Sequence, residues 1–115
     1  MIDVDGILLT SDQRGIVESI VAARLPHREV RVFGSRARGP IKRHSDLDLL
    51  VLGMSRLDLS TRAELNDDFD ESDLPFRVDV VDANAIDPSF LARVLPGSVL
   101  LRLATQPSPT PPHPA

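Results

Sequence analysis

The most constraining stretch of the sequence is "SDLDLLVLG", residues 45–53, where two aspartates stand in a run of leucine and valine. Apolar residues at nearly every position predict a central strand that is covered on both faces. Because alternate residues of a strand point to one face about 7 Å apart, Asp46 and Asp48 should project side by side. Their repulsion is on the order of 2 to 3 kcal/mol at an effective dielectric constant near 20, and it adds to the cost of dehydrating each carboxylate. A strand carrying both therefore needs a counter-charge.

A divalent cation would supply that counter-charge, since no basic residue lies within the strand. Carboxylate oxygens on a rigid strand, with positions left for phosphate oxygens and water, suit Mg²⁺ better than zinc or copper. The alternative is structural, because Ser-Asp is a common turn or capping pair and Asp46 could then face solvent. That alternative accounts for Asp46 but not for Asp48, which is followed by four apolar residues.

The stretch "GSRARG" predicts a phosphate site next to these aspartates. Gly34 ends a predicted strand, "EVRVFG", and Ser35 can begin a short helix whose free N–H groups and hydroxyl face an anion. Arg36 and Arg38 follow as candidate phosphate partners, although one or both could instead be solvent-facing helix residues.

Asp79 is the third candidate carboxylate, in the predicted strand "FRVDVVD", residues 76–82. If this strand lies next to 46–53, a lateral spacing of roughly 5 Å or less brings Asp79 to the same cluster. Three carboxylates around two Mg²⁺ ions form an arrangement that promotes in-line phosphoryl transfer. Asp82 has the opposite strand parity and is predicted to end the strand.

Helices complete the predicted fold. Thr10 and Gln13 form a capping-box pair before an apolar face of helical spacing that Pro26 ends. A weakly amphipathic helix is expected over 60–72. Asp87-Pro88 predicts the start of another helix, and a short last strand is expected in "SVLLRL", residues 98–103. The pattern predicts an α/β (α+β) fold, a small mixed β-sheet flanked by helices.

Length and composition limit what else the chain can be. At 115 residues it has room for one compact domain, predicted over residues 1–103. The stretch "ATQPSPTPPHPA", residues 104–115, is expected to be a disordered or polyproline-like tail. The chain has no cysteine for a disulfide or a thiolate zinc site. It also lacks an apolar run of about 20 residues and a signal-peptide pattern, so we expect no membrane association and a cytoplasmic protein.

Charge is distributed unevenly along the chain. The net charge of −4 and an aromatic content of 3% argue against direct nucleic-acid binding. Between residues 28 and 43 there is one acid, and this segment is predicted to form a local anion site from its basic residues Arg28, Arg31, Arg36, Arg38, Lys42 and Arg43. Residues 46–82 are strongly acidic, which predicts a solvated surface or, alternatively, a docking surface for a basic partner.

The sequence resembles the signature of the polymerase-β-type nucleotidyltransferases. The matching parts are Gly34-Ser35, a gap of ten residues, Asp46-Leu47-Asp48 and the later Asp79. The wording "FGSRARG…SDLDLLV" is similar to their minimal nucleotidyltransferase (MNT) branch, and the resemblance spans roughly residues 10–103. It implies the nucleotidyltransferase fold and transfer of a nucleoside monophosphate from a triphosphate to a hydroxyl. It further implies that Gly34 and Ser35 hold the β- and γ-phosphates, that Asp46 and Asp48 ligate both Mg²⁺ ions, and that Asp79 completes one metal site and helps activate the hydroxyl.

The MNT resemblance also implies a partner. Many members are the antitoxin of a toxin–antitoxin pair whose toxin is a helical HEPN ribonuclease, and they transfer AMP from ATP to a tyrosine of that toxin. One alternative is an antitoxin that neutralises its partner by binding alone. Another is a small-molecule nucleotidyltransferase of the aminoglycoside type, which is disfavoured because those relatives carry an added helical domain.

Overall fold

The computed structural model describes residues 7–41 and 45–104. One four-stranded sheet runs through it in the order β3-β2-β1-β4; β1 is antiparallel to β2 and β4, and β2 is parallel to β3. The elements are α1 (Ser11–Arg24), β1 (Val30–Phe33), α2 (Ser35–Arg38), β2 (Leu47–Val51), α3 (Leu59–Asp70), β3 (Val78–Asp82), α4 (Pro88–Val94), η1 (Leu95–Gly97) and β4 (Val99–Arg102). The predicted fold, a small mixed β-sheet flanked by helices, is confirmed.

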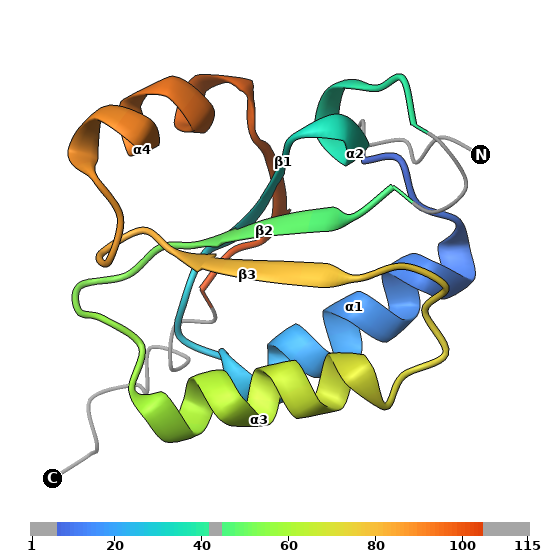
Figure 1. Cartoon of the computed structure of the whole chain (residues 1–115). Helices are drawn as coiled ribbons and strands as arrows, with labels where there is room; N and C mark the ends of the chain where they lie inside the picture. Colours follow the sequence, from blue (N-terminus) through green and yellow to red (C-terminus); the bar gives the residue numbers. More distant parts are fainter. Residues whose placement is uncertain (1–6, 42–44, 105–115) are drawn as a thin grey trace, which may run out of the picture.

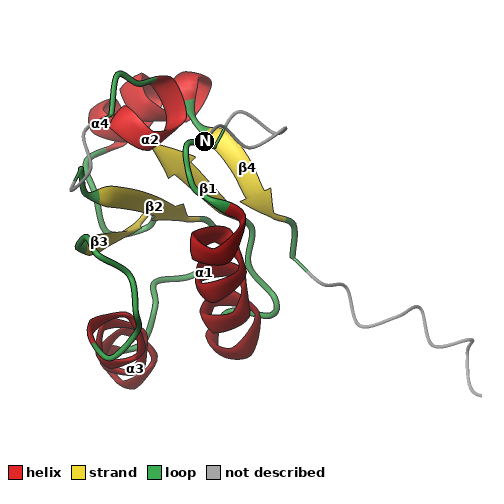
Figure 2. Cartoon of the chain, turned by 90° about the vertical axis from the view of Figure 1, so that its right-hand side faces the viewer, coloured by secondary structure: helices red, strands yellow, loops and turns green. Residues whose placement is uncertain are grey.

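The helices are divided between the two faces of the sheet. In Figure 1, α1 and α3 lie below the sheet, and α2 and α4 lie above it. Figure 2 shows the same division from the side. Within the described ranges, none of the helices combines the length and apolar character needed to cross a membrane. The predicted proline-rich tail lies outside the described residues from 105 onward.

Local signals fix the ends of the helices. The hydroxyl of Thr10 accepts a hydrogen bond from the backbone N–H of Gln13 at 3.1 Å, and the Gln13 side chain accepts one from the N–H of Thr10 at 3.0 Å, so the predicted capping box is confirmed. Asp58 caps α3 in a similar way. Asp87 caps α4 just before Pro88, as predicted from the sequence.

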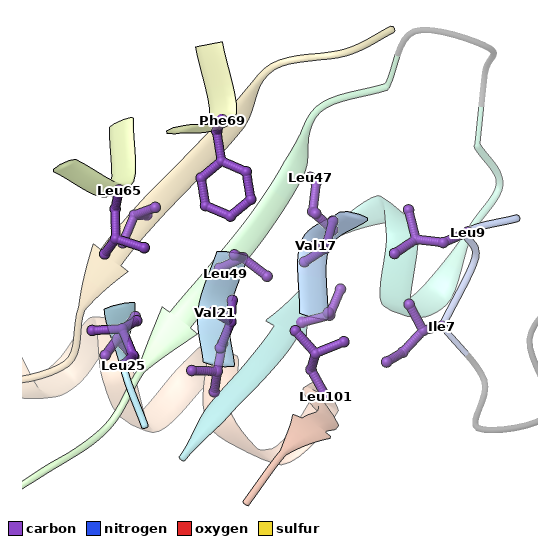
Figure 3. Packing of buried hydrophobic residues seen from close by; sticks show 14 residues of the cluster. Ile7, Leu9, Val17, Val21, Leu25, Leu47, Leu49, Leu65, Phe69 and Leu101 are labelled. Atoms are coloured by element: carbon purple, nitrogen blue, oxygen red, sulfur yellow. The ribbon is translucent and has the colours of Figure 1, made fainter. Parts of the chain in front are cut away.

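The hydrophobic core lies between the sheet and the α1–α3 layer. Leu47 and Leu49 of β2 belong to one buried cluster with Val17 and Val21 of α1 (Figure 3). Leu65 and Phe69 of α3 close this cluster from the side of β3. Since side chains alternate along a strand, Asp48 and Leu50 point to the opposite face, where Leu50 is also fully buried. The prediction of a central strand covered on both faces is thus confirmed.

Asp82 ends β3 as a buried structural carboxylate, 3% exposed. It accepts hydrogen bonds from the backbone N–H groups of Leu57 at 2.7 Å and of Asn84 at 2.9 Å. These contacts connect the loop before α3 to the turn after β3. The expectation that Asp82 ends the strand, apart from the other aspartates, is confirmed.

Candidate active site

Asp48 and Asp79 lie side by side on the sheet face that points away from α1 and α3. β2 and β3 are parallel neighbours, and their register pairs these two residues directly. Paired residues of adjacent strands point to the same face about 5 Å apart. The structure therefore brings together the two carboxylates that the sequence predicts on separate strands.

Asp46 differs in part from the sequence expectation. β2 begins at Leu47, so Asp46 lies one residue before the strand, and its side chain is exposed. Its negative charge nevertheless acts on Asp48. Dehydration therefore acts on Asp48 and not on the exposed Asp46, which contributes a charge from the rim of the site.

Burial and the charges of two other aspartates act on the Asp48 carboxyl. Burial raises the pKa of its carboxyl above the usual value, and the charges of Asp79 and Asp46 raise that pKa further. Arg77 pairs with Asp79, with 3.9 Å between Nη2 and Oδ1, but its side chain is 82% exposed. An ion pair this open to water offsets little of the repulsion.

Gly34 forms the tight turn that faces this cluster. Its φ of 74° is in the left-handed region, and a Cβ at this position would lie 2.5 Å from Oδ2 of Asp48. Only glycine satisfies both conditions. The turn connects β1 to α2, whose first residue is Ser35. Gly34 therefore lies against the Asp48 carboxylate, and Ser35 follows it at the start of α2.

Arg36 does not occupy the position expected from the sequence. Its side chain is 3% exposed, so it neither faces solvent nor opens toward the cavity of the carboxylates. Nε donates to the carbonyl of Ser45 at 3.0 Å, Nη1 donates to that of Leu8 at 2.8 Å, and the guanidinium lies 3.9 Å from the ring centroid of Phe76. Burial lowers the pKa of Arg36, and the nearby charge of Asp46 opposes this shift. Arg36 thus joins the segments that lead into β2 and β3.

The other described basic residues of 28–43 have different partners, so they do not form together the single anion site predicted for the segment. Arg28 donates to the carbonyl of Ser55, and Arg31 pairs with Glu29 and Ser98. Arg38 of α2 is exposed and lines a small cavity together with Gly34. Lys42 and Arg43 lie outside the described residues.

A cavity of about 630 Å³ opens over Asp48 and Asp79. Phe33 and Phe90 form part of its wall, with their rings edge to face and the centroids 6.3 Å apart. Arg62 of α3 also lines it. The sequence reasoning missed these three residues. Only Phe33 had a local signal, because it immediately precedes Gly34.

The carboxylates fit Mg²⁺ by ligand type but do not yet surround an ion. Among residues 7–41 and 45–104, no three His, Asp or Glu side chains stand close enough together to hold a metal. Asp46, the third predicted carboxylate, is exposed and precedes β2. The donors are nevertheless all carboxylate oxygens, the ligands that suit Mg²⁺, and Gly34 lets the backbone approach the Asp48 carboxylate more closely than any side chain would allow. Asp48 and Asp79 are the paired residues that would hold a metal here, with Asp46 as the third predicted ligand.

Comparisons with known proteins agree with this site. The family model "Polymerase beta, Nucleotidyltransferase" matches residues 18–105. The "Probable protein adenylyltransferase MntA" of Haemophilus influenzae is 42% identical over 74 residues, which are 64% of this chain and 65% of that protein. The chain thus spans slightly less than two thirds of the length of this relative.

Two solved structures share the fold. One is the MntA–HpeT toxin–antitoxin in a variant with two aspartates replaced by glutamate; it has 24% identity and a TM-score of 0.65. The other is a toxin–antitoxin with AMP-PNP, at 26% identity and a TM-score of 0.66. Each match covers 78% of this chain and 73% of the other. Because the family model covers most of the sequence and the motif residues meet in space, the chain belongs to the polymerase β nucleotidyltransferase family.

Proposed function

We propose that this protein is a Mg²⁺-dependent adenylyltransferase that transfers AMP from ATP to a tyrosine hydroxyl of a cognate HEPN-type toxin and so acts as its antitoxin. The observation that carries the proposal is the direct pairing of Asp48 with Asp79 beside the Gly34 turn, with the charge of Asp46 acting on the same point. We place the reaction in the cytoplasm.

Different residues serve the triphosphate and the acceptor hydroxyl. Gly34 and Ser35 hold the β- and γ-phosphates, and Asp46, Asp48 and Asp79 hold two Mg²⁺ ions. Bound Mg²⁺ would neutralise the carboxylates and favour ionisation of the attacking hydroxyl. Asp79, on the edge strand β3 and open to the 630 Å³ cavity, orients the acceptor hydroxyl and receives its proton. The acceptor oxygen forms a bond to the α-phosphorus as the bond to the β-phosphate oxygen breaks, and pyrophosphate leaves.

The relatives support a protein acceptor and a nucleoside triphosphate. One carries the name of a protein adenylyltransferase, and two structural neighbours are toxin–antitoxins, one of them with AMP-PNP. The position of Asp79 agrees with this, because β3 is an edge strand and an acceptor segment of another polypeptide can approach it from outside the sheet.

Coexpression with the toxin tests the proposal. Mass spectrometry of the purified toxin should show one tyrosine heavier by one or more AMP groups. Asp48→Asn should abolish this modification while the fold is retained. Asp67→Asn, at an exposed position of α3, is the matched control and should leave the modification unchanged. A toxin that is fully neutralised without any adduct would establish the alternative, an antitoxin that works by binding alone.

A further inference from the structure

A second, smaller cavity adjoins the carboxylate site at the end of β1. It has a volume of about 190 Å³ and is lined by Phe33, Gly34, Arg38, Arg93, Val94 and Gly97. Phe33 also lines the larger cavity, and Gly34 lies against Oδ2 of Asp48. The two cavities therefore meet at the Phe33–Gly34 turn, so that one extended ligand can occupy both.

The lining of the small cavity is cationic. Arg38 comes from α2 and Arg93 from α4, and no acidic residue lines the space. Within residues 7–41 and 45–104, neither guanidinium has an ion-pair or hydrogen-bond partner; Arg93 has only the ring of Phe90, 5.6 Å away. Two unneutralised guanidiniums that face one cavity attract an anion, and their planar forks match phosphate oxygens.

Gly97 determines where Arg38 lies. A Cβ at this position would overlap the end of the Arg38 side chain, namely Nη2, Cζ and Nε. The Arg38 guanidinium thus rests on the backbone of η1, which directly follows the helix that carries Arg93. This close approach directs Arg38 toward α4, so both arginines serve the same cavity.

We propose that Arg93 of α4 is a further binding residue for the terminal phosphates of the nucleoside triphosphate, which the proposed function assigns to the adjoining Gly34–Ser35 turn. The inference rests on the proposed function and extends it to α4. Ligand pockets for larger molecules have volumes of roughly 300 Å³ or more, so a cavity of about 190 Å³ suits a diphosphate better than a nucleoside. The same arginines hold pyrophosphate after transfer, when the bond to the α-phosphorus has broken.

Calorimetry with inorganic tripolyphosphate, at constant Mg²⁺, tests this cavity directly. A charge-assisted hydrogen bond corresponds to about a tenfold to hundredfold change in affinity, so Arg93→Gln and Arg38→Gln should each weaken binding by about that factor. Binding of AMP should be unchanged in Arg93→Gln. The control is Arg56→Gln, which removes the same charge from a residue that contacts the carbonyl of Asn84 and lines neither cavity.

Gly97→Ala offers a variant that keeps both arginines. Its φ is outside the left-handed region, so alanine displaces Arg38 without straining the backbone. Weaker tripolyphosphate binding in this variant, with an unchanged urea midpoint, supports the cavity. Equal affinity of Arg93→Gln and wild type overturns the inference, even if the toxin is modified. Conversely, if Arg93→Gln weakens tripolyphosphate binding but wild type never modifies the toxin, the cavity stands and the proposed function fails.

Discussion

At the scale of single residues, the charge of Asp48 links the site to the stability of the fold. Burial and two neighbouring carboxylates raise its pKa in the folded state. Protonated Asp48 therefore contributes its full stabilisation below the pKa of the unfolded state, about 3.8. This contribution is lost as the pH rises through the higher pKa of the folded state. We expect Asp48→Asn to be more stable than wild type at pH 7. The difference should disappear below about pH 3.8 in urea unfolding measured across this range.

Asp82→Asn is the matched control, because it makes the same chemical change in the neighbouring strand. Asp82 is buried and accepts two backbone hydrogen bonds, from Leu57 and Asn84. An amide can accept through only one of its two side-chain heavy atoms, so we expect a loss of about 1 to 3 kcal/mol. If both variants changed stability in the same direction at pH 7, the assignment of Asp48 as the destabilising carboxylate would be wrong.

Arg36 and Arg38 make a second matched pair, two positions apart. Arg36→Lys loses the planar fork that reaches both Ser45 and Leu8, and we expect it to lower the free energy of unfolding by about 1.5 to 3 kcal/mol. Arg38→Lys, at an exposed position, should change it by no more than about 0.5 kcal/mol. Equal effects in urea unfolding would contradict the structural role of Arg36.

At the scale of elements, the sequence predicts those features that depend only on residues close by in the chain, such as the starts of helices. The capping box at Thr10 and the Asp87-Pro88 helix start are local, and both are confirmed. The inward direction of Arg36 depends on carbonyls of two distant segments, at Leu8 and Ser45, so it could not be predicted from spacing. The partners of Arg28 and Arg31 also lie in distant segments, at Ser55 and Ser98, so closeness in sequence alone could not predict a shared anion site.

The turn between β1 and α2 gives the element-scale prediction. Gly34→Ala adds a Cβ at a positive φ and against Oδ2 of Asp48, so we expect a loss of about 1 to 3 kcal/mol in unfolding free energy. Gly15→Ala is the control, because a Cβ there, within α1, meets nothing within 4 Å. It should stabilise the protein by about 0.5 to 1 kcal/mol. A stable Gly34→Ala variant would show that this turn does not need glycine.

At the scale of the whole molecule, the two cavities place opposite charges on either side of one turn. Asp48 and Asp79 repel a phosphate that arrives without a cation, whereas Arg38 and Arg93 attract its far end. Mg²⁺ and a non-hydrolysable triphosphate should therefore bind cooperatively. Together, at a hundredfold excess over the dissociation constant, they should raise the free energy of unfolding by about 2.7 kcal/mol.

That cooperativity can be separated from simple ligand binding. In thermal unfolding, the triphosphate with a chelator should stabilise the wild type far less than the triphosphate with Mg²⁺. In the double variant Asp46→Asn, Asp48→Asn, the triphosphate should stabilise the protein nearly equally with Mg²⁺ and with a chelator. This variant removes two of the carboxylates that bind the metal and leaves both arginines in place. Equal stabilisation of the wild type with and without Mg²⁺ would mean that the arginines bind the ligand by themselves, and that the paired aspartates on β2 have a role other than holding a metal next to the phosphates.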